Sequence, residues 1–216
     1  MSLQLLSYIL PSFLTAIISF TVAVSTWRRR QAPGAFYFGA MMACVCIWTL
    51  SHAFDIMSAG SLVKDFWKNV AHLCIASVPP LWLLFALYFT ERAAQYQRYL
   101  IFLVVLPLIF WVLNITNPWH LLFWVDVEVV QGDGFQIFWR KPGPVFWLNM
   151  AWGYLQILVG VVVLIKQFFG APNIYRHQIM ATLLGVSIFW IAKFLSVWGI
   201  ETIPHFDLTP SSFALS

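Results

Sequence analysis

Long apolar runs separated by short polar turns extend along the whole chain. The runs are about 20 residues long and do not alternate, which is typical of membrane-spanning helices rather than of barrel strands. Within the third run, Pro79 and Pro80 should kink the helix or split it into two segments. Residues 117–143, rich in Trp, Gly and Asp, form the longest predicted loop. The pattern predicts about six spans, at residues 5–27, 35–57, 70–90, 99–115, 144–165 and 179–198.

Composition agrees with this pattern. Of 216 residues, 61% are hydrophobic and 9% are charged, and the mean hydropathy is +0.81. A soluble domain has about 45–50% apolar and about 25% charged residues, and a core of this size cannot bury so much apolar surface. Lipid can solvate that surface if helices satisfy every backbone polar group. We therefore expect an all-α, polytopic membrane helix bundle, with residues 1–216 as a single transmembrane domain and no soluble domain.

The cations set an expected orientation. The net charge of +4 comes from bases scattered at helix ends, so no basic face indicates nucleic-acid binding. With the N-terminus outside, more Lys and Arg fall in the inner loops than in the outer ones, which is the bias that orients membrane proteins. An even number of spans then leaves the C-terminus outside as well. The inner set is Arg28, Arg29, Arg30, Arg92, Arg98, Lys166 and Arg176, and the outer set is Lys64, Lys68, Arg140 and Lys141.

Six short stretches occur in the order expected of a known family. They are Arg28–Ala35 with Trp48, Pro79–Thr90, Leu113–Trp124, Gly143–Trp147 with Tyr154, Arg176–Gln178, and Asp207–Pro210. Together they resemble the seven-helix N-terminal sensor region of bacterial membrane histidine kinases. The resemblance implies signal transduction in the bacterial inner membrane. It also implies a seventh helix, of which Thr209–Ser216 would be only the first turns. Lys193 departs from the family, which tends to have Pro and then Asn in that stretch.

Two functions stay open. The resemblance implies a membrane-embedded sensor whose seventh helix passes a ligand-induced shift to a kinase on the inner side. The other reading is a non-catalytic structural or accessory subunit of a larger membrane complex, in contact with lipids or pigments. No stretch has the composition of a kinase or nucleotide-binding module, so we expect no enzyme activity. The expected partners are the lipid bilayer and other membrane-protein subunits, and the sequence requires no cofactor.

Candidate ligand-binding residues are those that carry charge or titrate near the outer side. Ionisable groups at membrane depth are unfavourable and therefore indicate function. Asp55 in the second span and Lys193 in the sixth have similar predicted depths, which makes an ion pair across the bundle one interpretation and snorkelling of the Lys another. His52 shares a helix face with Asp55. His120 and Trp190 complete the predicted set, with interfacial hydrogen bonding as the alternative for the histidines.

Five tryptophans lie deep within the predicted spans. They either line an apolar ligand cavity or contribute to ordinary helix packing. They are Trp48, Trp82, Trp111, Trp152 and Trp190. The spacing of the histidines and cysteines matches no metal site, so we expect no bound metal.

Overall fold

The computed structural model describes residues 3–58, 60–132, 135–170, 176–177, 179–185 and 187, and their side chains except at 3–8 and 127–140. Five long helices make up most of this part of the chain: α1 (Leu3–Arg28), α2 (Ala35–Met57), α3 (Ser61–Phe89), α4 (Gln97–Ile115) and α6 (Pro144–Gly170). Three short elements join them: η1 (Ala93–Tyr96), α5 (Asn117–His120) and a hairpin of β1 (Trp124–Gly132) and β2 (Phe135–Pro142).

Five segments of the described chain are long and apolar enough to cross a membrane. They correspond to the first five predicted spans, which confirms a multi-pass membrane protein built from helices. Of the sixth predicted span, residues 179–185 and 187 are helical and the remainder lies outside the described residues.

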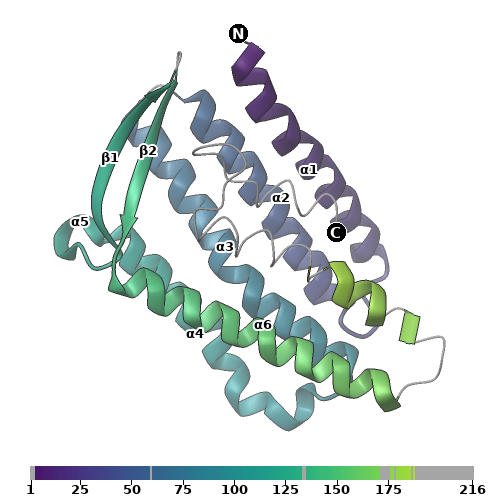
Figure 1. Cartoon of the computed structure of the whole chain (residues 1–216). Coiled ribbons are helices and arrows are strands. Elements are labelled where there is room, and N and C mark those ends of the chain that lie inside the picture. The colour runs from purple at the N-terminus through teal and green to yellow at the C-terminus, as the bar shows by residue number, and fades with distance from the viewer. Residues whose placement is uncertain are drawn as a thin grey trace.

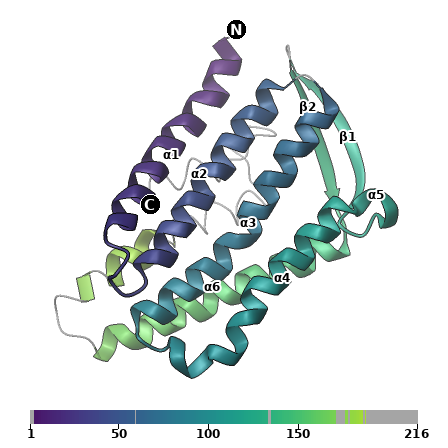
Figure 2. The ribbon, with the colours of Figure 1, turned by 180° about the vertical axis from the view of Figure 1, so that it is seen from behind.

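Helix α3 is the centre of the bundle. It packs against α2 on one side and against α4 and α6 on the other, while α1 packs against α2 (Figures 1 and 2). In its most apolar window 67% of the residues are buried, compared with 22% for the segment that contains α4. Helix α3 therefore takes the interior position. Helix α4 is apolar on all sides, and in a membrane lipid can cover the sides that other helices leave exposed.

The outer faces of α1, α4 and α6 are apolar and exposed. In water such a surface would be an aggregation site, whereas lipid solvates it. By contrast, the buried side of α1 carries Ser12, Thr15, Ala16 and Ser19. Small side chains allow two membrane helices to approach closely, so this stripe explains how α1 packs on α2. Examples of the exposed apolar residues are Leu14, Ile17, Phe20, Ile101, Val104, Val112, Leu155 and Leu158.

The predicted start of the third span is wrong, since helix α3 begins at Ser61 rather than near residue 70. The helix also runs through Pro79 and Pro80 without being split into two segments, so of the two predicted effects of these prolines only a kink stays a prediction. Lys64, predicted to lie in an outer loop, is a helical residue that is only 4% exposed. Its Nζ donates a hydrogen bond of 2.7 Å to the main-chain oxygen of Asp55. A cation at the last carbonyls of a helix is favourable, so the first turn of α3 caps the end of α2.

The predicted loop 117–143 contains ordered structure. After the single turn α5, strands β1 and β2 pair antiparallel, from Trp124 opposite Pro142 to Gly132 opposite Phe135. The hairpin lies beside the end of the bundle where α3 begins (Figure 1). In the described part of the chain the spans are all helical, as expected, and this hairpin is the β structure that the sequence reading missed.

Candidate functional site

A network of polar side chains joins the base of the hairpin to the helices. The Asn114 amide of α4 donates to Asn69 Oδ1 of α3 at 2.9 Å, and its Oδ1 accepts from Trp124 Nε1 at 2.7 Å. Trp111 Nε1 also donates to the main-chain oxygen of Asn69, at 3.0 Å. We call this network, with Asn117 and His120 described next, the hairpin clasp.

Asn117 closes the turn between α5 and β1. Its Oδ1 accepts hydrogen bonds from the backbone N–H groups of Phe123 at 2.9 Å and Trp124 at 3.0 Å. Its Nδ2 donates to the Trp124 carbonyl at 2.9 Å. Phe123 is fully buried and meets the His72 ring of α3 edge to face. The clasp therefore satisfies backbone groups that a buried turn would otherwise leave unpaired.

His120 is engaged within its own turn. Its Nδ1 accepts a hydrogen bond from the Leu122 N–H at 3.0 Å, and its Nε2 lies 3.2 Å from Thr116 Oγ1. Because Thr116 Oγ1 donates to Val112 O, we assign the imidazole proton to Nε2. Both ring nitrogens thus have local partners, which favours the structural interpretation of His120 over a ligand-binding one.

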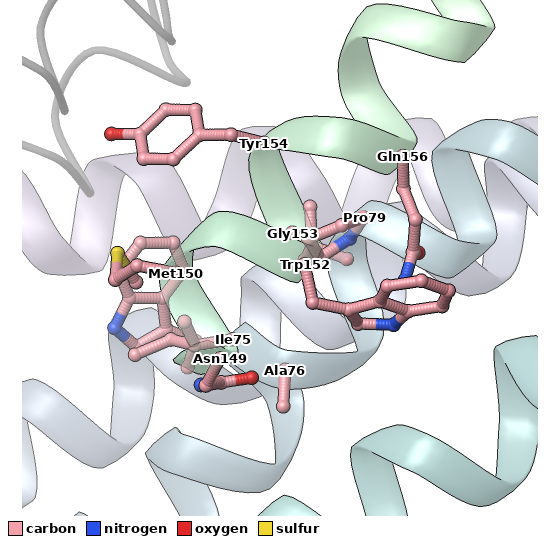
Figure 3. A pocket seen from close by; sticks show the side chains of 11 residues that line it. Ile75, Ala76, Pro79, Asn149, Met150, Trp152, Gly153, Tyr154 and Gln156 are labelled. Atoms are coloured by element: carbon pink, nitrogen blue, oxygen red, sulfur yellow. The ribbon is translucent and has the colours of Figure 1, made fainter. Parts of the chain in front are cut away.

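A second polar region lies within the spans, between α3 and α6. A cavity of about 40 Å³ opens here, and we call it the α3–α6 cavity. Figure 3 shows side chains of α3 and α6 around it. Its lining comprises Trp48 of α2, Ile75, Ala76, Val78 and Pro79 of α3, and Asn149, Met150, Trp152, Gly153, Tyr154 and Gln156 of α6.

Gln156 is the unusual residue of this cavity. It is only 2% exposed, yet within the described residues neither Oε1 nor Nε2 of its amide has a hydrogen-bond partner. Trp152 lies one turn earlier on the same face of α6, and its buried Nε1 also has no partner there. Leaving a buried polar group unpaired is unfavourable by about 1–3 kcal/mol, so each such group requires an explanation.

The two prolines of α3 change the hydrogen bonding of the helix backbone beside the cavity. Proline has no N–H, so the carbonyls of Ile75 and Ala76 lack the usual donor four residues on, at Pro79 and Pro80. Ile75 and Ala76 both line the cavity. The cavity is therefore lined by the two residues of α3 whose carbonyls lack this donor and by Gln156 of α6, whose amide is unpaired among the described residues.

Two glycines hold α3 and α6 in close contact around the cavity. A Cβ on Gly153 would lie 3.3 Å from Pro79 Cγ, and one on Gly160 would lie 2.4 Å from Trp82 Nε1. Trp82 is 1% exposed, and its Nε1 donates to the Ile157 carbonyl of α6 at 3.3 Å. Gln156 lies between the two glycines along the helix, so it belongs to a segment where α3 and α6 approach closely.

A family model described as the N-terminal 7TM region of histidine kinase matches residues 11–216. The match covers nearly the whole chain. The chain belongs to this family of sensor regions. The resemblance inferred from the six sequence stretches is thereby confirmed. Comparisons with curated proteins and with solved structures give no match.

The stretches that identified the sensor region contribute to these two places. Leu113–Trp124 supplies most of the hairpin clasp. Pro79–Thr90 supplies Pro79 of the cavity wall and Trp82 of the contact with α6, and Tyr154 lines the cavity from α6. Gly143 packs against the clasp, since a Cβ there would lie 2.4 Å from the Leu122 carbonyl oxygen. The stretches that resemble the family therefore contribute to both the hairpin clasp and the α3–α6 cavity.

Of the predicted ligand residues, the three that the structure describes, His52, Asp55 and His120, do not line the cavity. His52 and Asp55 lie near the end of α2, where Asp55 Oδ1 is buried without a hydrogen bond among the described residues. Lys193 and Trp190 lie outside the described residues, so an Asp55–Lys193 pair stays a prediction. In the part of the chain that the structure describes, no three His, Cys, Asp or Glu side chains converge as metal ligands would.

Sequence reasoning missed the polar residues of the cavity because it searched for charges. Asn149 and Gln156 are neutral, and Asn149 is also buried. A signal was available, since two polar residues seven positions apart share a helix face with Trp152 between them. Of the deep tryptophans, Trp48 and Trp152 line the cavity, whereas Trp82 packs against Gly160 and Trp111 belongs to the clasp.

Proposed function

We propose that this sensor region detects a signal inside the membrane, through occupancy of the α3–α6 cavity. The observation that carries the proposal is the buried amide of Gln156, which has no partner among the described residues although it lies at a helix contact. A polar group that contributes nothing to the fold is best explained by a binding role. Folds commonly tolerate such a local cost at functional sites.

The proposed mechanism is a shift between two arrangements of α3 and α6. A ligand that pairs with Gln156 binds one arrangement better than the other and so changes their populations. Because Gly153 and Gly160 meet rigid, buried groups, small changes at the cavity must move the helices relative to each other rather than be absorbed. The movement would then reach an inner kinase through the helices that follow α6.

The proposed location is the bacterial inner membrane with the N-terminus outside. Helix α1 ends at Arg28, and Arg29 and Arg30 follow in the next turn. At the same end of the bundle, Arg92 lies between α3 and α4, and Arg98 lies at the start of α4. This cation-rich end would be cytoplasmic by the positive-inside rule. The hairpin clasp would then face the outside.

The first test is to read the gene beyond the codon for Ser216. The sensor function predicts that the reading frame continues through a seventh helix into a dimerisation helix with a phospho-acceptor histidine. A stop codon at that point would overturn the proposal for this chain and would support the accessory-subunit reading instead.

The second test uses the full-length protein in membrane vesicles. Autophosphorylation should change when the contact of α3 with α6 is altered by Gly160→Ala. The matched control is Gly170→Ala on the same helix, where an added Cβ meets nothing within 4 Å. Equal autophosphorylation in wild type and both variants would contradict signalling through this helix pair.

A further inference from the structure

The α3–α6 cavity has a chemistry that restricts what it can bind. The Gln156 amide presents one acceptor oxygen and a donor NH₂ group, and Trp152 presents a second donor. Ile75 and Ala76, which line the cavity from the opposite helix, have carbonyl acceptors that lack their usual helical donor. A complementary ligand must therefore both donate and accept hydrogen bonds.

Charge on the ligand is disfavoured. Among the described residues, those that line the cavity include no Asp, Glu, Lys, Arg or His. Transfer of an ionised group into such surroundings without a counter-charge is far more unfavourable than transfer of a neutral polar group. The complementary ligand is consequently uncharged.

Size restricts the ligand further. A single enclosed water requires about 10–15 Å³ measured in the same way, so a cavity of about 40 Å³ has room for roughly three such units. An aromatic ring needs a much larger space, since a cavity that binds benzene measures about 150 Å³. The cavity can enclose a hydroxyl or amide head and not a whole lipid-sized molecule.

We propose that the α3–α6 cavity binds the uncharged polar head of a small membrane-soluble molecule of the alcohol or primary-amide class. This inference rests on the proposed function, because it names the ligand chemistry of the same site. The head pairs with Gln156 and with the proline-freed carbonyls, and its apolar remainder lies among the surrounding apolar side chains. Binding converts unpaired groups into paired ones and so favours the arrangement of α3 and α6 that closes on the head.

The test is photolabelling of the purified full chain in lipid nanodiscs. The probe is octanol bearing a diazirine on its alkyl chain, and labelled residues are mapped by mass spectrometry. We expect saturable labelling at cavity residues of α3 and α6, such as Pro79 and Trp152. Unlabelled hexanol and hexanamide should compete with the probe, whereas hexane and hexanoate should not.

A pair of variants tests whether the probe binds through the amide of Gln156. Gln156→Leu should raise the probe's Kd about tenfold, as expected for loss of a hydrogen bond of about 1.4 kcal/mol. Gln167→Leu, the same change on the same helix away from the cavity, should leave the Kd unchanged. Gln156→Met preserves the length of the side chain without its amide and gives a second variant in case the branched Leu does not fit.

Three results would overturn the inference. Unchanged labelling in Gln156→Leu would place the probe elsewhere. Competition by hexane as strong as by hexanol would show an apolar site. Absence of saturable labelling would mean that the cavity holds water only. Labelling reports binding and not signalling, so a reading frame that ends at Ser216 would overturn the proposed function and leave the labelling result intact.

Discussion

The hairpin clasp and the α3–α6 cavity are both polar regions of an apolar bundle, but they differ in how their polar groups are used. In the clasp, the amides of Asn114 and Asn117 both donate and accept hydrogen bonds. In the cavity, the amide of Gln156 does neither with any described residue. The difference separates polar residues that build the fold from one that the fold does not use.

The use of hydrogen bonds separates the cavity amide from the clasp amides, whereas burial alone does not. Gln156 and Asn114 are 2% and 5% exposed, so both are removed from solvent. The lipid around the bundle cannot replace a missing hydrogen bond as bulk water does at the surface of a soluble protein. An unpaired amide is therefore a stronger indication of a ligand than the charged residues from which the sequence analysis began.

The largest expected effect is at the centre of the clasp. Asn117→Leu should lower the free energy of unfolding by about 3 kcal/mol, because it leaves the buried N–H of Phe123 and the half-buried N–H of Trp124 without their acceptor. Reversible unfolding in mixed micelles measures this free energy. Asn117→Asp retains an acceptor oxygen and should lower the free energy of unfolding by less than Asn117→Leu does. A loss below about 1 kcal/mol for Asn117→Leu would show that the clasp is not structural.

The second largest loss of stability is expected where α3 and α6 are in close contact beside the cavity. Gly160→Ala should destabilise the protein by about 2 kcal/mol, because the added methyl group overlaps the buried Trp82 indole. Thermal unfolding in detergent measures this as a lower midpoint temperature, and the midpoint of Gly170→Ala should not change. Equal shifts in the two variants would indicate an effect of helix propensity rather than of packing.

A smaller effect is expected where α3 caps α2. Lys64→Met removes the hydrogen bond to the Asp55 carbonyl and should lower the free energy of unfolding by about 1 kcal/mol. The control is Lys141→Met, since Lys141 is exposed. If both variants unfold alike, Lys64 is not a cap and Asp55 returns to consideration as half of a functional ion pair.

The spans could be predicted from the sequence because lipid solvation imposes long apolar runs. The start of α3 could not be predicted from the sequence, because Lys64, Asp65 and Lys68 lower the local hydropathy although they lie in a helix. The hairpin was missed although its signal was present. Val125, Val127 and Val129 alternate with Asp126 and Glu128, and Gly132 follows shortly after, which is a strand and turn pattern.

The cavity could not be predicted because it depends on tertiary contact. Nothing in the residue types of Gln156 and Trp152 says that their polar atoms lack partners, since that follows only from what α3 places opposite them. Pro79 and Pro80 were singled out as a kink or a split in the helix. The helix is not split there, and the two residues one turn earlier, Ile75 and Ala76, line the cavity with carbonyls that lack their usual donor.

The free energy of unfolding of Gln156→Leu in mixed micelles tests the central claim most directly. If the amide is reserved for a ligand, its replacement by an apolar side chain of similar size should raise stability by about 1 kcal/mol, opposite in sign to Asn117→Leu. A loss of stability of about 1 kcal/mol or more would contradict the claim. It would show that the Gln156 amide supports the fold in the way the clasp amides do.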